Sequence, residues 1–483
     1  MKLKYFFILF ILGISTMVAN AQVDRLVYWI HGLGGDASSW QQAAEASMYG
    51  GSGLSARRLY SYQPEYTQFN NTISTASTKL HQDVLVGGDV FSNTYNITDK
   101  TQNFIIAHSQ GGIVSRYLDK RYNDQPWLGR RFGGIVTFGT PHQGAQALNN
   151  QAMLTQLINE GCNDLLIGPA TEQILRSFPL KLIVSGNDVE NVLEPLCKFV
   201  SNTIVPILTA SFTSPIQQDY RVGAAALSEI NGASTPTHKV AFYGVEEEPV
   251  MYRMLYNLEA KKPNQFPTFE ADDDSPLVDE ANNNLLKYQA KLTLAQTYLD
   301  AFGAPGRSYC SWYQWLSVPL WCAYNDYKVN ETRDLRDIRN GWRKGVDWWT
   351  NANSRYEAAI GAADVISTTQ TGYECFCTQY DYDGNEVNSF ATEVTSPQEC
   401  YNTGNMLTGC SLGNTTTVTT YQAITKPSDG LVLEESASDF QGAPKKEMVK
   451  SNHQQMRNDS NTKDRLTELY DGRYGSYFFT APR

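Results

Sequence analysis

Short apolar runs alternate with helix-like segments over residues 22 to about 250. "RLVYWI" (25–30) ends at His-Gly, "NFIIAH" (103–108) ends at a serine, and "HKVAFYGV" (238–245) has the same strand-like character. Alternation of this kind predicts an α/β architecture, with a mostly parallel sheet covered by helices on both faces. The functional site of such a sheet lies at the carboxyl ends of its strands.

The pattern changes at about residue 250. We predict that residues 251–425 form an inserted α+β cap, first helical and then built from short strands that contain cysteines, and that the core resumes over 426–483. In the first part of the core (22–250), the apolar segment at about 145–215 is the expected helical lid. The aromatic run "WYQWLSVPLW" (312–321) is expected to form the core of the cap, with a lipid-facing surface as the alternative.

The first 21 residues have the pattern of a cleaved signal peptide. Lys2 and Lys4 precede the apolar run "FFILFILGI", and "ANA" (19–21) supplies the small residues of a cleavage site before Gln22. We therefore expect cleavage between Ala21 and Gln22 and a secreted or periplasmic protein. The formal net charge of −11 becomes more negative once the two lysines are removed, which argues against nucleic acid as a partner.

Eight cysteines in an exported chain are candidates for disulfides. Two candidate pairs are Cys162–Cys197 and Cys310–Cys322. Cys375 and Cys377 lie too close together for the usual zinc knuckle and have no histidine nearby. "DYDGNE" (381–386) lacks the later ligands of a calcium loop and is interpreted as a turn. We expect neither a metal nor a cofactor.

The segment "AHSQGG" (107–112) joins a predicted strand to a predicted helix. A serine at such a turn, followed by glycine, has its hydroxyl exposed above the sheet, and small neighbours let the two backbones approach closely. The helix also directs its first amides towards the same point, where an oxyanion would form. Ser109 is therefore the candidate nucleophile, with Ala107 in the place of the usual first glycine.

A second glycine-rich turn, "IHGLGG" (30–35), follows the first predicted strand. An oxyanion hole takes one donor from the residue after the nucleophile and one from an earlier strand-to-helix loop. The main-chain amides of Gln110 and Leu33 fit these two roles.

A nucleophilic serine needs a base and an orienting acid. Of the six histidines, His453 remains once the others are assigned to turns, helices, strands or the elbow itself, and Asp429 lies 24 positions before it. Serine, acid and histidine then follow one another in the chain order of the α/β-hydrolases. Glu434 and Glu435 are the alternative acids, and Asp188 is a weaker one. The histidines set aside are His31, His81, His108, His142 and His238.

Five segments resemble the lipase and esterase branch of the α/β-hydrolases, including secreted bacterial triacylglycerol lipases and the GPI inositol-deacylase-like group. They are "HGLGG", "AHSQGG", "VTFGTPHQGA", "SDGLV" and "NHQQM". The resemblance implies Ser109 as nucleophile, His453 as base, Asp429 as acid, and Leu33 and Gln110 as oxyanion donors. Some of these lipases carry a calcium-binding aspartate two residues after the histidine, where this chain has Gln455.

The expected function is a secreted serine hydrolase that cleaves carboxylic esters, of lipid or acyl type, through an acyl-enzyme. An amidase or peptidase with the same mechanism and a non-catalytic ligand-binding protein on this scaffold are the alternatives. The expected partner is a small-molecule or lipid ester substrate, with transient contact to a lipid interface and no stable protein partner. Acyl length, head group and substrate-binding residues are left open.

Overall fold

The computed structural model describes residues 24–66, 71–166, 215–254, 269, 275–303, 309–383 and 386–483. The predicted signal peptide, Asp188, Cys197 and much of the expected lid lie outside these ranges. Within them, no helix combines the length and the apolar character that crossing a bilayer requires.

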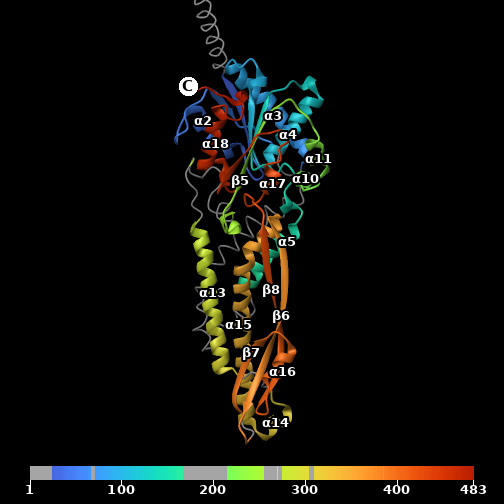
Figure 1. Cartoon of the computed structure of the whole chain (residues 1–483), viewed down its shortest axis with the longest axis vertical. Helices are drawn as coiled ribbons and strands as arrows, with labels where there is room; N and C mark the ends of the chain where they lie inside the picture. Colours follow the sequence, from blue (N-terminus) through green and yellow to red (C-terminus); the bar gives the residue numbers. More distant parts are fainter. Residues whose placement is uncertain are drawn as a thin grey trace, which may run out of the picture.

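A six-stranded parallel sheet lies at the centre of the body of the molecule. Figure 1 shows this body at one end of the molecule, with helices around the sheet. All five strand pairings are parallel, and the sheet order is β2-β1-β3-β4-β5-β9. The predicted mostly parallel α/β sheet is confirmed. Its strands are β1 (Arg25–Ile30), β2 (Leu59–Tyr62), β3 (Phe104–His108), β4 (Gly134–Phe138), β5 (His238–Val245) and β9 (Lys445–Val449).

Helices cover both faces of this sheet. On one face, side chains of α3 (Ile73–Thr94) and α4 (Gln110–Asp124) share a core with Tyr28 of β1. On the other face, α2 (Gln41–Tyr49) and α18 (Ser460–Tyr470) pack with Trp29. Successive strand residues point to opposite faces, so burial on both sides explains why all six residues of β1 are buried and why the strand is apolar throughout.

The chain leaves the sheet after β5 and returns to it at β9, and most of the residues between them form a long arm (Figure 1). The 42-residue helix α15 is about 60 Å long at 1.5 Å per residue. The 18-residue strands β6 and β8 pair beside it in a three-stranded antiparallel sheet, so the strands are long rather than short as predicted. Uninterrupted β-branched runs such as "TTTVTT" favour this extension. The arm contains α13 (Ser275–Phe302), α14 (Trp312–Ser317), α15 (Pro319–Ile360), β6 (Ala363–Tyr380), β7 (Glu386–Val394), α16 (Pro397–Thr403) and β8 (Thr408–Thr425).

The described part of the expected lid packs against the arm near the point where the arm joins the body. Helix α5 (Gln151–Leu166) packs along α15, where the Trp348 indole N–H donates to the Leu157 carbonyl at 3.3 Å and Arg355 pairs with Glu160 at 2.5 Å. The described chain also contains several 3-10 turns and the short helices α10 (Pro215–Asp219), α11 (Ala225–Asn231) and α17 (Glu434–Ala437).

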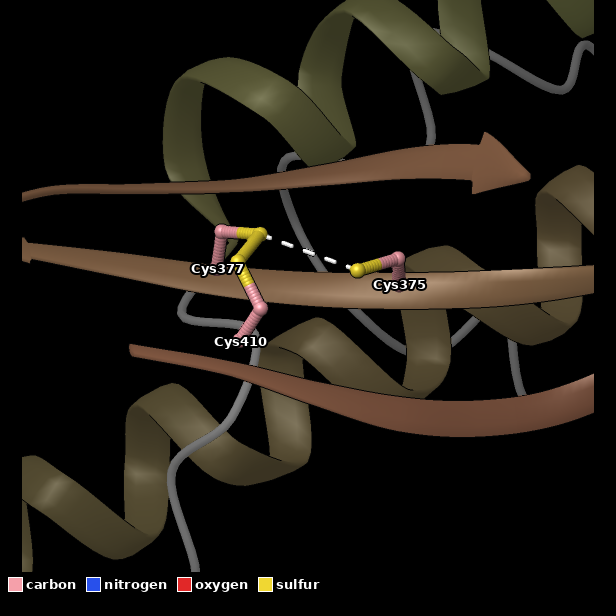
Figure 2. Close-up of side chains that lie close together, drawn as sticks. All are labelled: Cys375, Cys377 and Cys410. Carbon is pink, nitrogen blue, oxygen red and sulfur yellow. Dashed lines mark hydrogen bonds between the residues drawn. A yellow bond between two sulfur atoms is a disulfide. The ribbon is translucent and has the colours of Figure 1, made fainter. Parts of the chain in front are cut away.

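Three disulfides close segments of the arm. Cys310–Cys322 is one of the two candidate pairs named from the sequence, and the other, Cys162–Cys197, includes a residue outside the described ranges. Cys375–Cys400 and Cys377–Cys410 were not among the candidates. The Cys375 and Cys377 sulfurs lie 3.7 Å apart on β6. Figure 2 shows them beside the Cys377–Cys410 disulfide. Together with the Cys410 sulfur they form a compact group, but each of these sulfurs belongs to a disulfide and is therefore no thiolate ligand while the bridges are intact.

A pair of carboxyl groups lies where the arm joins the body. Glu357, near the end of α15, is buried, and this burial, with a hydrogen bond to the Glu248 side chain, raises its pKa to about 9. The Asn353 amide donates to Glu248 at 2.7 Å and its oxygen accepts from the Met251 N–H at 2.8 Å. The junction is thus a hydrogen-bonded connection that favours a protonated Glu357.

We predict that Glu357→Gln stabilises the protein increasingly as the pH rises. The raised pKa of Glu357 in the folded state means that its contribution to stability is complete below pH 4.5 and is lost as the pH rises through about 9. The melting temperature of the variant should therefore equal that of the wild type in acid and exceed it at alkaline pH. Glu45→Gln, at an exposed position, is the control, and a difference that does not change with pH would contradict the prediction.

Candidate active site

The strand-to-helix turn at Ser109 has the geometry of a nucleophile elbow. Ser109 follows β3 and precedes α4 with φ of 52° and ψ of −127°, a left-handed conformation that is uncommon for a residue with a side chain. Its N–H donates to the Phe138 carbonyl at 2.9 Å, which ties the turn to the end of β4. A Cβ at Gly111 would overlap the main-chain oxygen of His31, so the glycine allows α4 to lie against β1.

The structure brings Ser109, His453 and Asp429 together in one line of hydrogen bonds. With its proton on Nδ1, the His453 ring donates to Asp429 Oδ2 at 2.8 Å, and its Nε2 accepts from the Ser109 hydroxyl at 2.9 Å. All three side chains are buried or nearly so, with Ser109 exposing 8% of its surface. Nucleophile, base and orienting acid require this arrangement of contacts.

Asp429 is held as a carboxylate acceptor by the turn in which it lies. Its Oδ1 accepts from the N–H groups of Leu431 and Val432 at 3.0 and 2.7 Å, and its carbonyl accepts from the His453 N–H at 2.8 Å. The turn follows β8 of the arm rather than a strand of the central sheet. Among the described candidate acids, Asp429 contacts the imidazole, and neither Glu434 nor Glu435 does.

Two residues that the sequence analysis did not assign support this line. The His108 ring lies against the loop of His453, and its Nε2–H donates to the His453 carbonyl at 2.7 Å. Burial, reinforced by the positive charge available to His453, lowers the pKa of His108 well below its ordinary value and keeps the ring neutral. Gly139 has φ of 57°, and a Cβ there would lie 3.0 Å from Asp429 Oδ2 and 2.5 Å from the Met456 sulfur. The motif "VTFGTPHQGA" contains Gly139 and the motif "AHSQGG" contains His108, but neither motif by itself gives the residue a supporting role.

The glycine-rich loop after β1 reaches the same serine. A Cβ at Gly32 would lie 2.9 Å from the Ser109 Cβ, so the segment that carries Leu33 borders the nucleophile. The loop is anchored by His31, whose Nε2 lies 3.0 Å from Glu65 and whose ring stacks on Tyr66 at 4.5 Å. The hydrogen bond with His31 is the main reason that the pKa of Glu65 is lowered. The Tyr66 hydroxyl also donates to the His31 carbonyl at 2.9 Å.

The sheet, the elbow and the order of the three residues together identify the fold. A serine on a sharp turn between a central parallel strand and the following helix, with acid and histidine later in the chain, is characteristic of one superfamily. The chain has an α/β-hydrolase fold. The arm occupies the interval between β5 and β9 of this fold.

Several solved structures resemble the chain at low identity and low TM-score. No protein-family model matches the chain, and no curated protein matches it. The lipase BlEst2 from Bacillus licheniformis in its mature form is 14% identical at a TM-score of 0.27, covering 47% of this chain and 69% of that chain. The propeptide form of the same lipase is 9% identical at a TM-score of 0.28, covering 84% of this chain and 76% of that chain. Phospholipase PlaB from Legionella pneumophila is 11% identical at a TM-score of 0.28, covering 75% of this chain and 74% of that chain. Because these scores are low, the fold assignment rests on the topology and the elbow.

We predict opposite effects of alanine at two helical glycines. Gly111→Ala should destabilise the protein by about 1–3 kcal/mol because its Cβ meets the backbone of β1. Gly341→Ala, in the middle of α15 with open space around it, should stabilise its helix by about 0.5–1 kcal/mol. Chemical denaturation of the two variants measures both effects, and equal midpoints would refute the close approach at the elbow.

Proposed function

We propose that the protein is a serine hydrolase that cleaves carboxylic esters through an acyl-enzyme. The observation that carries the proposal is the buried line of hydrogen bonds from the Ser109 hydroxyl through His453 to Asp429. Burying polar groups costs free energy unless each of them has a hydrogen-bond partner. Here the carboxylate of Asp429 accepts three hydrogen bonds.

The hydroxyl of Ser109 attacks the ester carbonyl while His453 Nε2 takes its proton. Asp429 holds the ring in the tautomer that presents Nε2 to the serine, and it stabilises the imidazolium that forms. His453 then gives the proton to the leaving alcohol. A water molecule, activated by the same imidazole, hydrolyses the acyl-enzyme and regenerates the serine.

The oxyanion of each tetrahedral intermediate is assigned to the amides of Leu33 and Gln110. Gln110 is the first residue of α4, so its N–H lies at the positive end of the helix dipole, beside the nucleophile. Leu33 follows Gly32, which packs on Ser109. Both amides belong to segments held in place by main-chain and side-chain contacts, which supports preorganised stabilisation of charge.

We assign an acyl or lipid ester as the substrate class, on the resemblance of the five motif segments to secreted lipases and esterases. We also propose that the protein is exported. The apolar segment after Lys2 and Lys4 supports this, and so do three disulfides, which persist in oxidising compartments.

Ser109→Ala should abolish covalent labelling by a fluorophosphonate probe and reduce ester turnover by about 10⁴-fold or more, in a chain that circular dichroism shows to be folded. Ser115→Ala is the matched control, because Ser115 is a buried serine of the same helix whose hydroxyl donates only to the Gly111 carbonyl at 2.7 Å. It should keep both labelling and turnover. Labelling that survives Ser109→Ala would remove the proposed nucleophile.

Esters of graded acyl length, offered below and above their solubility limit, test the substrate class. We expect turnover of esters and little or none of the matched amides. A rise in rate above the solubility limit would identify a lipase. Turnover of amides in preference to esters would instead indicate an amidase or peptidase, and no turnover of either would favour a ligand-binding protein.

A further inference from the structure

The far end of the arm carries an exposed apolar surface. Residues 309–325, here called the tip, include α14 and the first turns of α15 and contain no charged side chain. The predicted core role of this segment is wrong: Trp312, Leu316 and Leu320 expose 77%, 76% and 88% of their surface. The arm is too thin at this end to enclose them. Tyr313, Val318 and Trp321 are exposed as well.

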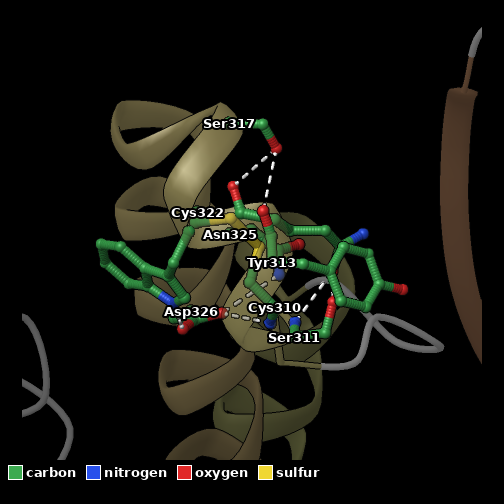
Figure 3. The surroundings of a disulfide bond; sticks show 9 residues. Cys310, Ser311, Tyr313, Ser317, Cys322, Asn325 and Asp326 are labelled. Atoms are coloured by element: carbon green, nitrogen blue, oxygen red, sulfur yellow. Dashed lines mark hydrogen bonds between the residues drawn. A yellow bond between two sulfur atoms is a disulfide. The ribbon is translucent and has the colours of Figure 1, made fainter.

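The tip is a built structure rather than a loose loop. The Cys310–Cys322 disulfide joins its two sides, and Figure 3 shows the polar groups that gather around it. The Ser311 N–H and hydroxyl both donate to Gln314, at 2.8 and 2.7 Å. Asp326, just beyond the tip, accepts from the Cys310 N–H at 2.8 Å and from the Trp315 indole at 3.2 Å. The polar side chains thus serve the local fold, and the outward surface is apolar.

The position of the tip excludes a role as a lid over Ser109. Helix α15 begins in the tip at Pro319 and ends at Ile360, which packs in the core of the body. Its 42 residues separate these ends by about 60 Å. Figure 1 shows α14 at the end of the arm away from the central sheet. The tip therefore requires a partner of its own.

We propose that the tip docks the protein on the surface of a lipid bilayer. Trp and Tyr rings prefer the headgroup region, and exposed leucines such as Leu316 and Leu320 gain free energy by entering the acyl boundary. Residues 309–325 carry no charged side chain, so the outward surface of the tip is complementary to an uncharged interface. The Ser311 hydroxyl and the Gln314 side-chain oxygen bond to each other, so these two groups are not available to a glycan. The proposal does not depend on the proposed chemistry at Ser109.

Flotation with phosphatidylcholine vesicles tests the proposal on the chain that begins at Gln22. The wild type should float with the vesicles equally at low and high salt, because the contact is apolar. The double variant Leu316→Asp/Leu320→Asp should lower the bound fraction by roughly tenfold or more. The matched control Val86→Asp/Val90→Asp replaces two valines of α3 that expose 66% and 60% of their surface on the body, and it should bind like the wild type.

Three outcomes would overturn the proposal. The wild type could fail to float, it could instead bind an insoluble polysaccharide in a tip-dependent way, or it could form tip-dependent dimers without vesicles. An unchanged circular dichroism spectrum of the tip variant shows that the chain is folded. Ser109→Ala should float like the wild type, so loss of docking and loss of hydrolysis are distinguishable.

Discussion

The imidazole of His453 is the group on which the arrangement of the body depends. It connects a serine 344 residues earlier in the chain to an acid 24 residues earlier, and both contacts are buried. Removing one partner would leave a buried polar group unpaired, which costs more than the hydrogen bond itself contributes. The surrounding contacts show how this is avoided: main-chain amides hold the carboxylate, and the neutral His108 ring holds the loop of the base. The hydrogen bonds that hold these side chains in position therefore also determine the electrostatics of the site.

The body accommodates a large insertion because its ends meet. Glu246 directly follows β5 and Ser428 lies just after the arm, and the Glu246 N–H donates to the Ser428 carbonyl at 2.8 Å, so the chain can leave and return without opening the core. The same arrangement joins the arm to the site. Asp429 lies four residues after the end of β8, and the Tyr356 hydroxyl of α15 donates to the Gly430 carbonyl at 2.7 Å. The acid is thus positioned between the last strand of the arm and the body.

The two ends of the molecule are suited to different tasks. At the body, glycines such as Gly32 and Gly139 allow backbone to approach the reacting groups, and polar atoms converge there. At the tip, polar groups such as those of Ser311 and Gln314 bond to each other, and apolar side chains face outward. A rigid helix between them separates a chemical site from a docking surface, so each could change without the other.

The sequence by itself determined the parallel α/β body and the identities of Ser109, Asp429 and His453 as the residues to bring together. Those features follow from patterns visible in the sequence: apolar runs of the kind that is buried on both faces, a serine at a strand end with glycines after it, and a fixed chain order. The tertiary structure alone decided the support from His108 and Gly139, the pairing of Cys375 and Cys377 with distant cysteines, and the length of the strands in the arm. It also decided that Trp312 and Leu320 are exposed. The sequence of an aromatic run is the same whether the run lies in a core or on a surface. Its burial depends on whether other segments pack around it, and those segments lie far apart in the chain.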